Sequence, residues 1–530
     1  MASSRMREES AKDEGFHKIT HPVLFKKPPR SGMVAGSSGL IWTSYKIRRM
    51  SPAILIALVI VYFLALLWIS WYTGRGASNQ SYFVGNKSSP WYIVAFGMIG
   101  TSLSGVTFVS VPGTVAASGM SYLMVVFGYF IGYLGVAYIL LPIYYRMQLT
   151  SIYHYLQERF GMTSYKTGAG LFIVSRTIGA TARLYLVIRV LQELVLDSLG
   201  IPFILTALCI LLLILAYTYK GGVKTIVWTD TLQTTFMLGG LIACTWYALD
   251  ALNLGFAEAW TRMQTLGYTH MVETDWLKGN FVLKHLLGGA FIALTMTGLD
   301  QEMMQKNISV RTLADSQKNV VTLSVILIAV NFLFLFLGGV LYLYSDASGL
   351  ALKGDDLFPT LALEHFPPVM GLVFIIALVS ALFPSADGAI TALTASTCID
   401  LIGMRRKNYS DEVQTRIRRR VHLSFAGVFL ICVLIFHWID SRSVIDLILK
   451  LAGYTYGPLL GLFAFGVVMK HKLKEAAVPF VCLIAPALTW LLADKAPVLL
   501  GGYTFGIELL LVNGLITFAG LYLVRKESNA

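Results

Sequence analysis

Long apolar runs follow one another along nearly the whole chain after residue 50, separated by shorter polar stretches. A membrane-spanning helix needs roughly 20 mainly apolar residues, and most of these runs approach or exceed that length. The pattern predicts thirteen spans, at residues 51–73, 91–113, 121–145, 166–196, 202–219, 225–249, 286–304, 319–344, 368–400, 421–439, 443–469, 476–493 and 501–524. The sequence therefore predicts an all-α polytopic membrane protein.

Residues 1–49 follow a different pattern from the rest of the chain. They are polar, mixed in charge and without periodicity, which is typical of a disordered segment. They also lack the apolar core of a signal peptide. Because Met50 directly precedes the first apolar run, we expect residues 1–49 to be a dispensable extension, and the sequence leaves open whether it is native.

The charges are placed as they are in membrane proteins. The chain carries 42 Lys and Arg against 29 Asp and Glu, a net charge of +13. The basic residues fall in alternate loops, whereas nucleic-acid binding would require a basic patch, so no nucleic-acid partner is expected. The positive-inside rule then predicts a plasma or inner membrane protein whose carboxyl terminus is cytoplasmic and whose first span starts outside.

Two of the predicted spans are rich in glycine. The run at 91–113 contains five helix-weakening Gly and Pro residues, and the run at 286–304 contains three glycines before it reaches Asp300. Five predicted helices separate their starts, a spacing typical of transporters whose two halves each begin with a broken helix. The alternative is that the glycines only allow close helix packing.

The stretch from Ala377 to Asp400 places hydroxyls and a carboxylate at membrane depth. Such groups are costly unless they line a cavity, pair with each other or hold an ion. Ser and Thr alone could serve only as contacts between helices. Asp387 and the helix-interrupting Pro384 favour a cation site instead, because hard cations prefer oxygen ligands.

Five motifs, in this order, resemble the sodium:solute symporter family. They are SYFVGNKSSPWY (81–92), TSIYHYLQERFG (150–161), GGVKTIVWTDTLQ (221–233), GLDQEMMQKNIS (298–309) and AGYTYGPLLGLFAFG (452–466). The third is similar to the family's most characteristic motif. The resemblance covers about residues 51–525 and leaves out the segment before Met50.

The resemblance implies the inverted-repeat fold of the bacterial leucine transporter, with five plus five helices around a central site. It implies a peripheral first helix at 50–80 and a ten-helix core at 81–469, in which the first and sixth core helices are broken. Residues 470–530 would form two peripheral helices and a cytoplasmic tail. Together these make thirteen helices, the number that hydropathy predicts.

The resemblance also implies a sodium site between the first and eighth core helices. Its backbone carbonyls would come from Gly100, Leu103 and Ala381, and its hydroxyl pair would fall on positions 384 and 385. Ser385 has a hydroxyl, but Pro384 does not, so one ligand of the family pattern is missing. Pro384 also cannot bond the carbonyl of Ser380, and that oxygen could serve the ion or be satisfied by a neighbour or water.

Asp230 is a further ionisable residue in an apolar span. In relatives the matching aspartate lies on the ion's exit route and in some of them binds a second sodium. The alternative is a structural carboxylate capped by a neighbouring threonine. Asp387 and the missing hydroxyl at 384 keep open a proton-coupled variant of the same fold.

The substrate pocket is less clear from the sequence. Where sugar-carrying relatives have a gating tyrosine and an asparagine, this chain has Met296 and Ala293, and Lys450 stands in place of a substrate glutamine. The remaining pocket candidates are Ser102, Thr107, Arg176 and Arg183.

The two arginines lie seven residues apart on one face of the third core helix, with Gly179 and Ala180 between them allowing close approach of another helix. Asp230, Asp387 and Glu193 could pair with these cations as structural partners. Unpaired, the arginines would suit an anionic solute such as a sugar acid or monocarboxylate.

The sequence therefore predicts a sodium-coupled secondary symporter for a small organic solute, working in the bilayer without an organic cofactor. A proton-coupled or neutral-sugar carrier of the same fold is the alternative. A membrane sensor would need a soluble signalling domain, and the chain has no room for one. A membrane enzyme would need a motif such as H-E-x-x-H or G-x-S-x-G, which is absent from the sequence. The sequence leaves the oligomeric state open.

Overall fold

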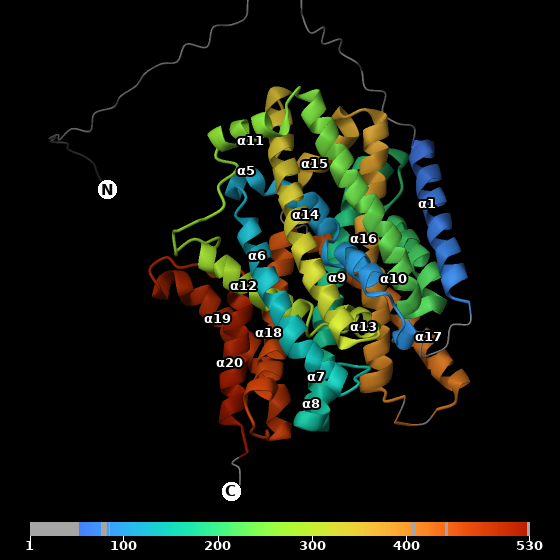
Figure 1. The fold of residues 1–530 in the computed structure, drawn as a ribbon, viewed down its shortest axis with the longest axis vertical. Coiled ribbons are helices and arrows are strands. Elements are labelled where there is room, and N and C mark those ends of the chain that lie inside the picture. Colours follow the sequence, from blue (N-terminus) through green and yellow to red (C-terminus); the bar gives the residue numbers. More distant parts are fainter. Residues whose placement is uncertain are drawn as a thin grey trace, which may run out of the picture. The chain divides into compact units, whose positions relative to one another are not determined.

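The structure, a computed structural model, describes residues 52–75, 82–83, 85–404, 406–407, 409–439 and 444–526. In this described part every regular element is a helix, and β-pairing is limited to three isolated bridges (Figure 1). The predicted all-α fold is confirmed. The predicted extension at residues 1–49 lies outside the described residues.

The first and sixth core helices are broken, as predicted. Helices α3 (Trp91–Ser102) and α4 (Gly105–Gly113) meet at 56°, and α12 (Val282–Met296) and α13 (Gln301–Ile308) meet at 67°. In the first break, Leu103 and Ser104 have extended backbone. In the second, the Asp300 carboxylate accepts hydrogen bonds from the N–H groups of Glu302 and Met303 and so caps α13.

The spans of the described residues fall where the apolar runs predict them. Eight helices are long and apolar enough to cross a membrane, and the two bent pairs bring the number to ten. Three shorter apolar helices, at Ala57–Thr73, Phe203–Tyr219 and Leu509–Leu523, lie at the positions of the other three predicted spans. The total of thirteen stays a prediction.

The longer helices outside the two broken pairs are α1 (Pro52–Thr73), α6 (Tyr122–Gly135), α9 (Met162–Leu191), α10 (Phe203–Ala251), α14 (Leu313–Ala347), α16 (Pro368–Ser396), α17 (Asp411–Ile439), α18 (Val444–Val468), α19 (Val478–Leu499) and α20 (Leu509–Leu523). The short ones are α5 (Val115–Ser118), α7 (Leu141–Arg146), α8 (His154–Arg159), α11 (Phe256–Thr265) and α15 (Leu357–Thr360). Turns of 3₁₀ or π geometry extend several of them.

Helix α10 is two predicted spans joined at a sharp break. Gly222 has φ +56°, and a Cβ there would lie 2.5 Å from the Cα of Tyr82. Only glycine fits both the backbone angle and the close approach. Beyond the break, α10 packs against α16 and α3, so the predicted ion region lies between these three helices.

The contact between α6 and α12 depends on backbone approach at glycine. A Cβ at Gly128, Gly132 or Gly289 would lie 2.2–2.3 Å from a carbonyl oxygen of the facing helix. Small residues allow membrane helices to pack this closely, so the glycines of the segment at 286–304 serve helix packing as well as lying in a broken helix. This contact sets the position of α12, which lines the central cavity described below.

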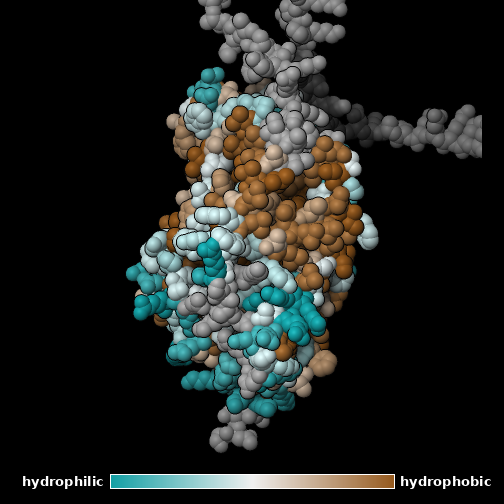
Figure 2. Space-filling view, turned by 90° about the vertical axis from the view of Figure 1, so that its right-hand side faces the viewer, coloured by the Kyte–Doolittle hydropathy of each residue, from teal (hydrophilic) through white to brown (hydrophobic). Residues whose placement is uncertain are grey.

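Apolar side chains cover much of the outer surface of the described part. Figure 2 shows them gathered in a broad band, with hydrophilic side chains below it. Trp68 and Val61 on α1, Trp246 and Ile242 on α10, and Trp438 on α17 are all exposed. Such a surface is stable only against lipid, so it agrees with the multi-pass membrane fold.

Candidate transport site

A cavity of about 110 Å³ lies at the break between α3 and α4. Six of the seven predicted pocket residues line it, namely Ser102, Thr107, Arg176, Arg183, Ala293 and Met296. The broken helices bring these residues together because the unwound segment at 103–104 opens space between α9, α12 and α14. Other lining side chains are Tyr122, Tyr129, Tyr133, Thr297 and Asn331.

The seventh predicted pocket residue, Lys450, lies elsewhere. It lines a second cavity of about 800 Å³ between α18, α19 and the start of α12, together with Tyr454, Trp490 and Asp494. Tyr122 lines both cavities, so the two adjoin. The structure therefore does not bring Lys450 together with the two arginines.

The two arginines have different surroundings. Arg176 is 3% exposed, donates a hydrogen bond to Glu302, and its Nε lies 3.7 Å from Asp300 Oδ2. Asp300 also accepts from the Tyr456 hydroxyl at 3.1 Å. The structural pairing considered for both arginines thus holds for Arg176.

Arg183 is half-buried, and its guanidinium makes no ion pair or hydrogen bond within the described residues.

None of the three carboxylates expected as partners contacts either arginine. Asp230 pairs with Lys306. Asp387 accepts a hydrogen bond from a tyrosine, and Glu193 pairs with Arg189. Of the two small residues between the arginines, Gly179 provides no close helix contact, because a Cβ there would meet nothing within 4 Å, whereas Ala180 is fully buried.

Hydroxyl groups surround the cavity that Arg183 faces. The Tyr122 and Tyr129 hydroxyls lie 3.4 Å apart, and the Tyr133 hydroxyl lies 3.4 Å from Ser102 Oγ and 3.3 Å from Thr297 Oγ1. Each hydroxyl can both donate and accept a hydrogen bond. One free guanidinium among several hydroxyls can bind a carboxylate and neighbouring polar groups of a small solute.

The predicted sodium ligands lie on two packed helices. Gly100 and Leu103 are at the end of α3, Ala381 and Ser385 are in α16, and all four are buried. Ser385 Oγ donates to the Leu382 carbonyl at 2.9 Å.

Pro384 lies inside α16, so the Ser380 carbonyl has no helical N–H donor. The Ser380 hydroxyl itself donates to Tyr62 on α1 at 3.0 Å. The ligand set stays a prediction.

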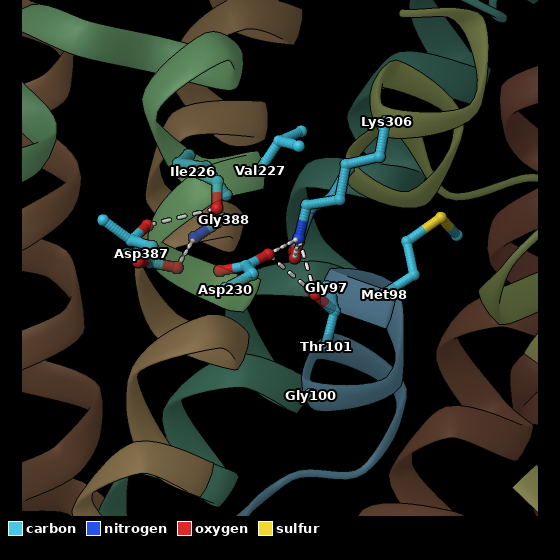
Figure 3. Close-up of polar contacts among 12 residues, drawn as sticks. Gly97, Met98, Gly100, Thr101, Ile226, Val227, Asp230, Lys306, Asp387 and Gly388 are labelled. Atoms are coloured by element: carbon cyan, nitrogen blue, oxygen red, sulfur yellow. Dashed lines mark hydrogen bonds and ion pairs between the residues drawn. The ribbon is translucent and has the colours of Figure 1, made fainter. Parts of the chain in front are cut away.

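Lys306 is a functional candidate that the sequence analysis missed. Its ammonium lies 2.7 Å from Asp230 Oδ2, 2.6 Å from Thr101 Oγ1 and 3.4 Å from Glu302 Oε1, and all four side chains are buried (Figure 3). The sequence does show that Lys306 lies in the motif at 298–309, at the end of a predicted span. A cation buried there needs an acidic partner, and this could have pointed to Lys306. The Asp230 carboxylate is thus ion-paired with Lys306 and also accepts from Thr101, and its role as an ion ligand or a structural carboxylate stays a prediction.

The second oxygen of Asp230 is left unpaired. Asp230 Oδ1 is buried and has no hydrogen-bond partner within the described residues. In Figure 3 the Asp230 carboxylate lies between Lys306 and Asp387. Asp387 is itself buried, accepting from the Tyr217 hydroxyl at 2.7 Å and from the Gly388 N–H. With Glu302, the region therefore holds three carboxylates, on α10, α13 and α16, around the Lys306 ammonium.

The sequence matches a family of known proteins. The sequence model of the Sodium:solute symporter family matches residues 82–479. The sodium/sialic acid symporter SiaT of Proteus mirabilis is 23% identical over 446 residues, covering 80% of this chain and 86% of that protein. Sodium-coupled monocarboxylate transporter 1 of Mus musculus is 26% identical over 443 residues, covering 80% of this chain and 68% of that protein.

The fold has a counterpart among solved structures. A Na⁺-coupled sialic acid symporter in a substrate-bound, outward-open state superposes with a TM-score of 0.76 at 18% identity, covering 89% of this chain and 99% of that one. The matched family and these relatives are transporters rather than enzymes. The family match extends over most of the chain and includes both broken helices. The chain belongs to the sodium:solute symporter family.

Proposed function

We propose that this chain is a sodium-coupled symporter that imports a small organic anion, and that Arg183 binds the carboxylate of that anion. The observation that carries the proposal is Arg183, which lines the central cavity and whose guanidinium makes no ion pair in the described residues. A desolvated cation is costly, and a bidentate carboxylate offsets that cost through two charge-assisted hydrogen bonds.

The relatives support the same solute class. The names of the two curated relatives refer to sialic acid and to monocarboxylates, and both kinds of solute carry a carboxylate. The hydroxyls around Arg183 suit the polar remainder of such a solute. Met296 and Ala293 offer no side-chain hydrogen bond where sugar carriers have tyrosine and asparagine, which disfavours a neutral sugar.

Sodium coupling is proposed from the family and from the oxygen groups at the first break. Unwound backbone carbonyls and half-helix ends are the usual cation ligands in this class of fold. The basic loops support import from outside, with the carboxyl terminus cytoplasmic. The ions and the solute would then share the space between α3, α9, α10 and α16.

A thermal-shift screen tests the proposal directly. We expect an acidic sugar or a monocarboxylate to raise the melting temperature in sodium chloride, and to do so less in choline chloride. Arg183→Lys keeps the charge but loses the planar fork, so it should weaken binding roughly tenfold or more.

Arg189→Lys, on the same helix but at an exposed pair with Glu193, is the matched control and should bind normally. Stabilisation by a neutral sugar, with acids inert, would contradict the proposed solute. Equal stabilisation in choline chloride would contradict the sodium coupling.

A further inference from the structure

The family pattern places two hydroxyls at positions 384 and 385, and this chain has only the second. A neighbouring helix brings another hydroxyl to the same place. The Cβ that any other residue would carry at Gly100 would lie 2.5 Å from Thr234 Oγ1 and 3.5 Å from the Pro384 ring. Thr234 of α10 and Pro384 of α16 therefore converge on one point beside Gly100 of α3.

The Thr234 hydroxyl is fixed at this point by its contacts with α3, but it has hydrogen-bonding capacity left. It accepts a hydrogen bond from the Gly100 N–H at 3.1 Å, and the Gly97 carbonyl lies 3.5 Å away. A hydroxyl oxygen has two lone pairs, so one remains for a further partner. The side chain is completely buried, which leaves bulk water out of that role.

The same part of α10 carries other buried oxygens without partners. Asp230 Oδ1 has none in the described residues, and neither does the Gln233 amide through its oxygen or its nitrogen. Both side chains are 0% exposed. Residues three and four apart share a helix face, so Asp230, Gln233 and Thr234 are presented together. Buried polar atoms left unpaired are costly, and such a cluster indicates a bound ligand.

We propose that Thr234 Oγ1 is a sodium ligand and replaces the hydroxyl that Pro384 lacks. The sodium site is then shared by α3, α10 and α16, instead of lying between α3 and α16 alone. This inference rests on the proposed sodium coupling. A hydroxyl on α10 has the same chemistry as one on α16, because a hard cation selects oxygen ligands by geometry and number.

Sodium titrations of purified protein and of proteoliposomes test this inference. Thr234→Val keeps the shape and removes the oxygen, so the sodium concentration for half-maximal uptake should rise roughly tenfold or more. The sodium-induced rise in melting temperature should fall in parallel, which provides a readout without transport. Thr234→Ser keeps the oxygen and should behave as wild type.

Thr235→Val is the matched control for the same substitution one residue away. The Thr235 side chain is exposed and its hydroxyl donates to the Thr231 carbonyl within the helix, so its sodium response should not change. If Thr234→Val cannot be purified in folded form, Thr234→Ala removes the same oxygen without placing a second methyl group near Gly100.

Restoring the family hydroxyl gives the sharpest test. Pro384→Ser combined with Thr234→Val should recover most of the lost sodium response, because α16 then supplies the hydroxyl oxygen that α10 has lost. A Thr234→Val protein with wild-type sodium response overturns the inference, and so does a double variant with no recovery. A wild-type protein without any sodium dependence would instead overturn the proposed coupling, so the two failures are distinguishable.

Discussion

Arg176 and Arg183 lie two helical turns apart on α9, yet they have different partners. Arg176 is buried against Asp300 and Glu302, whereas Arg183 faces the cavity without an ion pair in the described residues. Removing one member of a buried ion pair leaves the other charge uncompensated. The first arginine is therefore expected to serve stability, and the second to serve binding.

This difference predicts opposite effects of matched substitutions. Arg176→Gln should destabilise the solute-free protein by about 3–5 kcal/mol, because two carboxylates lose their cation. Arg183→Gln should leave the melting temperature nearly unchanged and abolish stabilisation by the anion. Thermal unfolding of both variants in detergent, with and without solute, measures this. Equal loss of stability in the two variants would contradict the assignment.

At the scale of elements, the position of α12 depends on its glycine contact with α6. A Cβ at Gly132 would lie 2.2 Å from the Ala290 carbonyl oxygen, and backbone cannot move aside cheaply. Gly132→Ala should therefore cost about 1–3 kcal/mol, as overpacking usually does. Gly179→Ala on α9 is the control, since nothing lies within 4 Å of its Cβ, and it should be neutral or slightly stabilising. Thermal unfolding of the two variants decides whether the close contact is required.

The half-helix α13 is held to α10 and α3 by Lys306. Lys306→Met should destabilise the protein by leaving Asp230 buried and unpaired, and adding Asp230→Asn should recover part of that loss. A double-mutant cycle in sodium-free choline buffer should give a coupling energy of about 0.5–3 kcal/mol. Strictly additive losses would mean that the pair does not hold α13 in place.

Hydropathy predicted most of the helices, because a membrane span needs a long apolar run. The glycine-rich segments indicated which two of the spans are broken. The side-chain contacts were harder to predict. Lys306 meets Asp230 from 76 positions away, and no spacing within one helix reveals such a contact. Arg176 and Arg183 look equivalent in the sequence, because their spacing places both on one helix face. In the structure only Arg176 contacts acidic residues at the start of α13. The sequence does not point to Thr234, which we propose as a sodium ligand, because the family pattern places the hydroxyl at position 384 itself.

At the scale of the whole molecule, the described part combines a lipid-facing apolar surface with a buried polar interior. The two broken helices contact each other, and both breaks supply residues to the central cavity. Helices α18 and α19 line the second cavity, and this cavity adjoins the central one at Tyr122. This arrangement suits a solute site that is entered from one side at a time.

Solute accumulation in proteoliposomes tests the central claim most directly. The measurement is uptake of a radiolabelled acidic sugar or monocarboxylate against its own gradient, driven in parallel by an inward sodium gradient and by an inward proton gradient without sodium. We predict accumulation with sodium, none with potassium or protons alone, and none with Arg183→Gln. Undiminished accumulation on the proton gradient in sodium-free buffer would contradict the account.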